Sequence, residues 1–327
     1  MLGARKLGAA EMAVHTPGMK PLAAHEIRGN WATLLLPIQP DDAIDFGLLG
    51  DEIEQFIAAR ATGIYSNGTA CELHTQTEAE FDRVNALLAE KCNRASLPFQ
   101  VGASHPCAQI SRERVRRAKA LEPSAFQVTL PDWYPPGMPE VIAFLESMAA
   151  EAAPVPLVVY NPPHAKRQLR PEDWALIVAR VPGVVGMKVA AGDDAWYAAM
   201  RPLFGRVSVF VPGHTLAEGV ARGAHGAYSN VACLSPAGAR RWYEQCVNDL
   251  PAAREVGRRI FAFWIGHIAP LITRDGLSPM AADKAAAVAG GWLPGLATRV
   301  RWPYRSVAPD VATHIGALAR RELPELF

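Results

Sequence analysis

The chain of 327 residues carries 33 Lys and Arg against 32 Asp and Glu, so its formal net charge is +1, and half of its residues are hydrophobic. Near-neutral charge, without a block of five or six like charges, argues against nucleic acid or an anionic membrane as the main partner. The densest basic run, residues 112–119, is expected to form one solvated helix face. The 26 Gly and 27 Pro residues punctuate short elements and exclude a long coiled coil.

The sequence lacks the features of membrane-spanning, secreted and nucleotide-binding proteins. Its longest apolar run, residues 152–160, contains two prolines and falls short of the roughly 18–20 residues that a membrane helix needs. Residues 1–29 hold no continuous apolar segment of about 7–15 residues, so we expect a flexible extension rather than a secretory signal. The glycine motifs of dinucleotide and phosphate binding are also missing, which leaves nucleotide chemistry without support.

The cysteines point to a reducing compartment. They are odd in number, widely spaced and free of a C-x-x-C motif, which disfavours a disulfide framework and a zinc ribbon. The five are Cys71, Cys92, Cys107, Cys233 and Cys246. A cytoplasmic location is therefore expected.

From residue 30 onward the chain repeats one unit, a short apolar run, a turn rich in Gly, Pro or Asn, and a segment with helical spacing. The apolar runs lack alternation, as expected for strands buried on both faces of a parallel sheet. The eight predicted strands are Trp31–Leu36, Gly63–Ser66, Pro98–Gly102, Ala125–Leu130, Leu157–Tyr160, Val184–Lys188, Val207–Val211 and Gly226–Ser229.

Helix starts are marked between these strands. Thr77 with Glu80 three residues later forms a capping box, and Pro171 and Pro236 occupy positions where a first helical residue is favoured. Eight strands alternating with helices predict an α/β fold, a (β/α)8 TIM barrel over residues 30–247 that serves as the catalytic domain. Residues 248–327, rich in Ala, Arg and Leu, are expected to add C-terminal helices beside the barrel.

Reactive residues in such barrels lie at the carboxyl ends of the strands. Lys188 ends the sixth predicted strand, where burial would lower its pKa and supply a neutral amine able to form a Schiff base. Tyr160 ends the fifth and could move protons. The small residues of the turn Gly68–Glu72 could present backbone N–H groups to a carboxylate. Taken singly, a solvent-exposed lysine, a core tyrosine and an ordinary turn explain the same residues.

Together these residues resemble the dihydrodipicolinate synthase and N-acetylneuraminate lyase family of class I aldolases, over roughly residues 29–246. The family's G-[TS]-T-G-E, Y-N-x-P, G-x-K, S-G-D and G-x-x-G-x-I-S motifs are similar, in chain order, to Asn67–Glu72, Val159–Pro163, Val185–Lys188 with Gly192-Asp193, Pro212–His214 and Gly223–Asn230. The order and spacing of five segments make the resemblance specific.

The resemblance implies a covalent mechanism without metal or organic cofactor. Lys188 would form the imine, Tyr160 would relay protons, and Thr69 would link a hydroxyl relay to the tyrosine. The implied substrate-binding residues are Gly68, Ala70, Cys71, Trp133, Tyr134, Gly213 and Tyr228. The family usually assembles as a dimer of dimers, with an aromatic hydroxyl lent across one interface, so a homo-oligomer, dimer or tetramer, is expected.

Departures from the family pattern bear on the substrate. Ala70 stands at the position of a second Thr and Cys71 at that of a Gly, so one hydroxyl contact to the carboxylate is lost. The arginine with which the synthase holds its second substrate aligns near Ala165, although Lys166 or Arg167 could partly substitute. Trp133, next to Tyr134, occupies the place of the lent tyrosine, and Tyr228 replaces an aliphatic residue. A true dihydrodipicolinate synthase is therefore not expected, and the aromatic residues suggest a larger or flatter substrate.

The leading hypothesis is a Schiff-base lyase that acts on pyruvate or another small 2-oxo acid or aldehyde by aldol cleavage, condensation or dehydration. Two alternatives stay open. Four histidines follow predicted strands and could hold the metal of a metal-dependent hydrolase, namely His74, His105, His164 and His214. The altered turn and Trp133 would also suit a non-catalytic barrel that only binds an oxo acid.

Overall fold

The computed structural model describes residues 19–327, so residues 1–18 of the predicted flexible extension lie outside the described residues. Residues 19–28 pack against the barrel, where the Leu22 amide donates a hydrogen bond to the Ser124 carbonyl at 2.9 Å and the Ile27 side chain is buried. In this part of the chain no helix is both long and apolar enough to cross a membrane.

Eight parallel strands close into a barrel in chain order, each pairing with its sequence neighbours, and β8 pairs with β1. The strands are β1 (Gly29–Thr33), β2 (Gly63–Tyr65), β3 (Phe99–Gly102), β4 (Ala125–Thr129), β5 (Leu157–Tyr160), β6 (Val184–Lys188), β7 (Ser208–Pro212) and β8 (Gly226–Tyr228). The predicted (β/α)8 class is confirmed. The largest difference lies in β1, which begins two residues and ends three residues before its predicted bounds, since Gly29 already pairs with Gly226.

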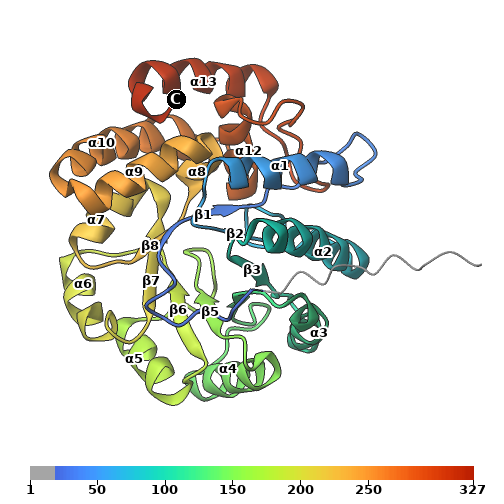
Figure 1. The fold of residues 1–327 in the computed structure, drawn as a ribbon, viewed down its shortest axis with the longest axis vertical. Helices are drawn as coiled ribbons and strands as arrows, with labels where there is room; N and C mark the ends of the chain where they lie inside the picture. The colour runs from blue at the N-terminus through green and yellow to red at the C-terminus, as the bar shows by residue number, and fades with distance from the viewer. Residues whose placement is uncertain (1–18) are drawn as a thin grey trace, which may run out of the picture.

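Helices surround the strands on the outside (Figure 1). Those of the barrel are α1 (Phe46–Ala58), α2 (Glu78–Ala95), α3 (Ala108–Ala118), α4 (Met138–Ala152), α5 (Pro171–Arg180), α6 (Asp194–Met200), α7 (Leu216–Ala221), α8 (Asn230–Leu234) and α9 (Pro236–Asn248), with short 3-10 turns at Lys119–Leu121, Arg201–Leu203 and Gly213–Thr215. The predicted capping box starts α2, since the Thr77 amide donates to Glu80 Oε2 at 2.9 Å. Pro171 and Pro236 are the first residues of α5 and α9.

The C-terminal helices pack along one side of the barrel, beside α1, α8 and α9 (Figure 1). They are α10 (Leu250–Phe263), the π-helical turn η4 (Trp264–Ile268), α11 (Ala269–Thr273), α12 (Pro279–Gly290), α13 (Pro309–Glu322) and the 3-10 turn Pro324–Leu326. Ser278 caps the start of α12, Pro279 opens it and left-handed Gly291 ends it, which are the residue types that favour those positions.

The expectation of one solvated face over residues 112–119 is wrong at Arg114. Its side chain is buried beneath α2, where it forms an ion pair with Glu78 at 2.7 Å and stacks over the Phe81 ring. The long apolar part of an arginine side chain packs readily against an aromatic ring. Arg116 and Arg117 pair with acidic residues nearer the surface.

Inside the barrel, a small aromatic cluster lies beneath the carboxyl ends of the strands. It contains Ile27, Trp31, Tyr65, Ala125, Val158, Phe210 and Tyr228. A Cβ atom on Gly63 would come within 2.7 Å of the Trp31 ring, so glycine on β2 makes room for the indole. This filled interior closes the barrel from below and leaves the cavity at its upper end.

Candidate active site

Lys188 lies at the carboxyl end of β6, beside Tyr160 at the end of β5. The two residues are partners in the parallel register, which places both side chains in one layer of the barrel. They line a cavity of about 450 Å³ at the mouth of the barrel. The strand-end rule therefore brings the predicted lysine and tyrosine together.

Three phenol rings surround the Lys188 amine. Its Nζ atom lies 3.9 Å from the centre of the Tyr160 ring, 4.7 Å from that of Tyr65 and 5.3 Å from that of Tyr228. It donates a hydrogen bond to the Tyr65 hydroxyl at 3.2 Å. Burial lowers the pKa of Lys188 to about 7, against a smaller opposing effect of Asp283. A large fraction of the amine is thus neutral, as a nucleophile for a carbonyl group must be.

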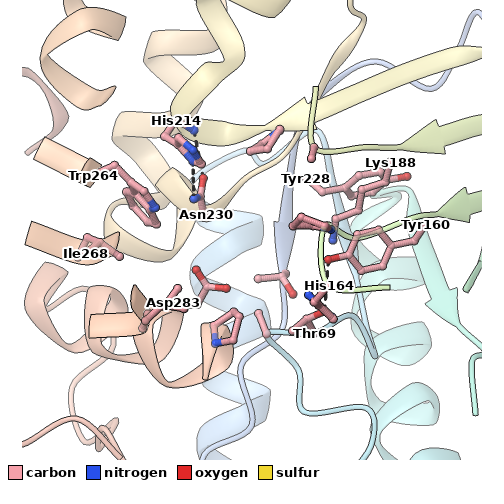
Figure 2. Close-up of a pocket in the computed structure, with 18 of the residues that line it drawn as sticks. Thr69, Tyr160, His164, Lys188, His214, Tyr228, Asn230, Trp264, Ile268 and Asp283 are labelled. Atoms are coloured by element: carbon pink, nitrogen blue, oxygen red, sulfur yellow. Dashed lines mark hydrogen bonds between the residues drawn. The ribbon is translucent and has the colours of Figure 1, made fainter. Parts of the chain in front are cut away.

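Tyr160 is hydrogen bonded to Thr69. The two hydroxyl oxygens lie 3.3 Å apart, and both residues line the cavity (Figure 2). Burial raises the pKa of Tyr160 to about 12, so the phenol is protonated and can donate. The pair has the geometry of a short proton relay next to the amine.

The turn that carries Thr69 runs between two residues with positive φ, Asn67 and Glu72. Ala70 lines the cavity, whereas Cys71 is fully buried behind the turn, and burial raises the pKa of its thiol to about 12. Gly68 packs against Tyr65, since a Cβ atom there would come within 2.8 Å of the ring. Of the predicted turn residues, Thr69 and Ala70 face the cavity, while Gly68 leaves room for Tyr65.

The ends of β7 and β8 form another side of the cavity. The Asn230 amide oxygen accepts a hydrogen bond from the His214 backbone N–H at 3.1 Å, and its Nδ2 lies 2.8 Å from the His214 ring Nδ1 (Figure 2). Nδ1 is therefore the acceptor and the ring proton lies on Nε2. Burial lowers the pKa of His214 to about 4, so the ring is neutral. A Cβ atom on Gly213 would come within 2.7 Å of Asn230 Oδ1, so this glycine permits the close approach of the two loops.

Tyr228 lines the cavity floor but directs its hydroxyl elsewhere. The hydroxyl donates a hydrogen bond to Gln100 Oε1 at 2.6 Å, and its ring packs edge to face against Tyr65 with 4.8 Å between centroids. Burial raises the pKa of Tyr228, and the phenol stays protonated. Its ring, rather than its hydroxyl, faces the site of Lys188.

The wall opposite Lys188 comes from the C-terminal helices. The π-helical turn η4 presents Trp264 and Ile268, the following helix presents Ile272, and α12 presents Asp283. Figure 2 shows the Asp283 carboxyl group directed across the cavity toward the side that holds Lys188 and Tyr160. Burial raises the pKa of Asp283 to about 7, and Lys188 partly opposes that effect.

Trp133 and Tyr134 do not reach this cavity in the single chain. They are 87% and 80% exposed, and the Lys166 ammonium lies 5.3 Å from the centre of the Trp133 ring. Their predicted role in substrate binding stays a prediction that depends on an assembly of subunits.

The four histidines considered as metal ligands are dispersed. His164 and His214 line the cavity, His74 packs against Tyr304, and His105 accepts a hydrogen bond from the Cys107 amide. Within residues 19–327, no three His, Cys, Asp or Glu side chains gather as a metal site would require.

Tyr65 and Asp283 are two of the cavity residues that were not singled out in the sequence. Tyr65 ends β2, so the strand-end rule that found Lys188 could have found it. Asp283 follows the last strand of the barrel by more than 50 residues, but it and Lys284 form the only acidic and basic pair in the Ala-rich stretch 281–290. Charged neighbours within a buried alanine helix are a usable signal, since buried charges require partners.

Known proteins resemble this chain in sequence and fold. A sequence model of the dihydrodipicolinate synthetase family matches residues 26–265. The 4-hydroxy-tetrahydrodipicolinate synthase of Thermomicrobium roseum is 26% identical over 239 residues, 72% of this chain and 78% of that protein.

Two solved structures share the fold. One is YagE, a prophage protein belonging to the dihydrodipicolinic acid synthase family from E. coli K12 in complex with pyruvate, with a TM-score of 0.80, 16% identity and coverage of 92% of this chain and 99% of that chain. The other is Proteus mirabilis N-acetylneuraminate lyase, with a TM-score of 0.77, 18% identity and coverage of 90% and 98%.

Proposed function

The chain belongs to the dihydrodipicolinate synthetase family, and from this premise we propose that it is a Schiff-base-forming lyase or aldolase acting on pyruvate or another 2-oxo acid. Aldol cleavage, aldol condensation and dehydration all fit this chemistry. The observation that carries the proposal is the buried Lys188 amine, enclosed by three phenol rings, whose pKa is lowered to about 7.

The residues at the cavity account for each step of imine formation. The neutral Lys188 amine attacks the C2 carbonyl carbon of the oxo acid, and the carbonyl oxygen takes up a proton to give a carbinolamine. Tyr160, hydrogen bonded to Thr69, protonates the leaving hydroxyl, and water departs as the protonated imine forms. This cation accepts the electron pair of the bond that breaks beta to the imine carbon, giving an enamine without metal or organic cofactor.

The turn Gly68–Cys71 is proposed to hold the carboxylate of the oxo acid. Thr69 and Ala70 already line the cavity, and their backbone N–H groups replace the hydroxyl contact that Ala70 cannot supply. Gly213 allows the loop that carries Asn230 to approach closely. Tyr228 forms the floor of the cavity with its ring.

We further propose that the chain is not a true dihydrodipicolinate synthase. Lys188 is the only Lys or Arg among the described residues that line the cavity. The two basic residues next to Ala165 are engaged elsewhere, since Lys166 Nζ donates to the Trp133 carbonyl at 3.0 Å and Arg167 pairs with Asp173 at 3.3 Å. A second substrate with its own carboxylate therefore lacks a basic partner in this chain.

Imine trapping tests the proposal. Incubation with borohydride and pyruvate, followed by intact-mass and peptide analysis, is expected to add the reduced oxo-acid mass to Lys188. Lys188→Arg is expected to trap nothing, whereas Lys166→Arg, a matched change outside the cavity lining, is expected to trap normally. Failure of the wild-type chain to trap any member of a broad oxo-acid panel would overturn the proposal. Trapping without turnover of any aldol product would instead favour a barrel that only binds oxo acids.

The proposal extends to the working form of the enzyme, a cytoplasmic homo-oligomer, dimer or tetramer, that needs no cofactor beyond the imine on Lys188. Support for assembly comes from Trp133 and Tyr134, two large aromatic side chains left exposed in the segment between β4 and α4.

A further inference from the structure

The wall opposite Lys188 is mostly apolar and carries one acidic group. Trp264, Ile268 and Ile272 supply its hydrocarbon surface, and Ala282 adds a methyl group beside Asp283. One face of Trp264 is covered by the neutral His214 ring, with centroids 5.4 Å apart and an interplanar angle of 2°. His214 thus supports the Trp264 ring, and the apolar surface of this wall suits a substrate that is largely apolar.

The helical turn η4 brings two large side chains to one cavity, because residues four positions apart lie on the same face of a helix. Residues 264 and 268 both point inward there, and π-helical turns occur often at functional sites. Their distance from the imine nitrogen across the cavity places them at the far end of a bound substrate, beyond the oxo-acid part (Figure 2).

Charge divides the cavity into two ends. Among the described lining residues, Lys188 is the only Lys or Arg and Asp283 the only Asp or Glu, and they face each other. Once an oxo acid is bound at Lys188, Asp283 is the acidic side chain of the described lining that faces an incoming aldehyde. A carboxylate brought against the ionised Asp283 side chain is disfavoured by like-charge repulsion, whereas a hydroxyl group can donate a hydrogen bond to it.

We infer that Asp283 determines specificity for the aldehyde half of the substrate: it accepts a hydrogen bond from the hydroxyl group of an uncharged, largely apolar aldehyde and excludes aldehydes that carry a carboxylate. In the condensation direction, the enamine carbon forms the new bond to the aldehyde carbon. The aldehyde oxygen takes a proton from Tyr160, the imine is regenerated, and water hydrolyses it to release a 4-hydroxy-2-oxo acid.

This inference rests on the proposed function, and its test separates the two. Three aldehydes of one shape, 3-hydroxybenzaldehyde, benzaldehyde and 3-carboxybenzaldehyde, are offered to the enzyme with pyruvate, and kcat/KM is measured for each. All three react with the same pyruvate enamine, so their ratios do not depend on how fast the imine forms. We expect 3-hydroxybenzaldehyde to exceed 3-carboxybenzaldehyde by about tenfold or more.

Variants locate the preference. Asp283→Asn keeps the size of the side chain and removes its charge, so the discrimination against 3-carboxybenzaldehyde is expected to fall by about tenfold. Asp283→Glu keeps the negative charge, so this variant is expected to retain part of the discrimination against 3-carboxybenzaldehyde. Asp310→Asn, the same change on the exposed start of α13, is expected to leave all three values unchanged.

Two outcomes would overturn the inference while leaving the proposed function intact. One is turnover of 3-carboxybenzaldehyde at least as fast as that of the hydroxyl compound. The other is turnover of none of the three by an enzyme that traps pyruvate on Lys188. Loss of pyruvate trapping itself would instead overturn the proposed function.

Discussion

Three phenol rings lie close to the Lys188 amine and take the place of part of its water. The pKa of Lys188, and with it the pH at which the amine is neutral, depends on this burial. The Lys188 side chain is half-buried and donates a hydrogen bond to the Tyr65 hydroxyl at 3.2 Å. Asp283 favours the charged form of Lys188, but less strongly than burial disfavours it, so the pKa of Lys188 is lowered. The neutral amine therefore becomes the main form near neutral pH.

This predicts the pH dependence of imine formation. The rate of trapping by cyanoborohydride with pyruvate is expected to rise with pH through about 7, because the amine is neutral above its pKa. It is expected to level off above roughly pH 8, where an ordinary lysine would still be almost fully protonated. Rapid-quench mass spectrometry on buffers from pH 5.5 to 10 measures the rate. A rate that keeps climbing to pH 10 would contradict the buried environment of Lys188.

Single residues also show how far a sequence can locate a site. Lys188, Tyr160 and Thr69 were predictable because each follows a short apolar run, and the ends of such runs meet in a parallel barrel. The sequence around Asp283 signals a buried charged residue, but its place at the cavity was not predictable, since it depends on how α12 packs across the barrel mouth. The exposure of Trp133 and Tyr134 was not predictable either, because the sequence of one segment does not show which other segments pack against it.

Among the elements, α12 is attached to the barrel by a buried ion pair. Lys284, next to Asp283, has a fully buried side chain that donates to Glu72 on the turn of Thr69 and to the Arg299 carbonyl at 2.7 Å. The second Glu72 oxygen accepts from the Arg301 backbone N–H at 2.8 Å. One carboxylate thus connects the turn, α12 and the segment before α13.

Removal of this lysine charge is predicted to destabilise the whole chain. Lys284→Met leaves Glu72 buried without its ammonium partner, and the expected loss in free energy of unfolding is about 3–5 kcal/mol. Urea unfolding followed by circular dichroism measures it. Lys20→Met, which breaks an exposed pair with Glu26, serves as the control and is expected to cost about 0–1 kcal/mol. Equal stability of the two variants would mean that the buried pair does not hold α12 in place.

For the whole molecule, the barrel was predictable from its apolar runs, because strands buried on both faces must be continuously hydrophobic. The sequence also indicated helices after residue 248. Their arrangement was not predictable, since it depends on which sides of the helices fit together. The same packing puts η4 and α12 over the cavity mouth.

Assembly is a separate property of the whole molecule, and exposed aromatic side chains at a barrel mouth suggest an interface. Replacing both Trp133 and Tyr134 by Ser is predicted to shift the protein toward smaller species by removing apolar contact area. Sedimentation velocity over a range of protein concentrations measures the shift. The double change Trp302→Ser and Tyr304→Ser, at another exposed aromatic pair, provides the comparison. An unchanged mass in the first variant would exclude this surface as the main contact.

The position of Lys284 beside Asp283 has a consequence for how such an enzyme can change over evolutionary time. The ion pair with Glu72 anchors the helix from behind, while Asp283 and Ala282 project from it into the cavity. The anchor and the recognition surface are therefore separate side chains of one helix. If the proposed function holds, substitutions at positions 264, 268, 272, 282 and 283 would alter the aldehyde preference while Lys284 and Lys188 stay unchanged. On that proposal, single substitutions in this wall would change the substrate preference and leave the anchoring of α12 intact.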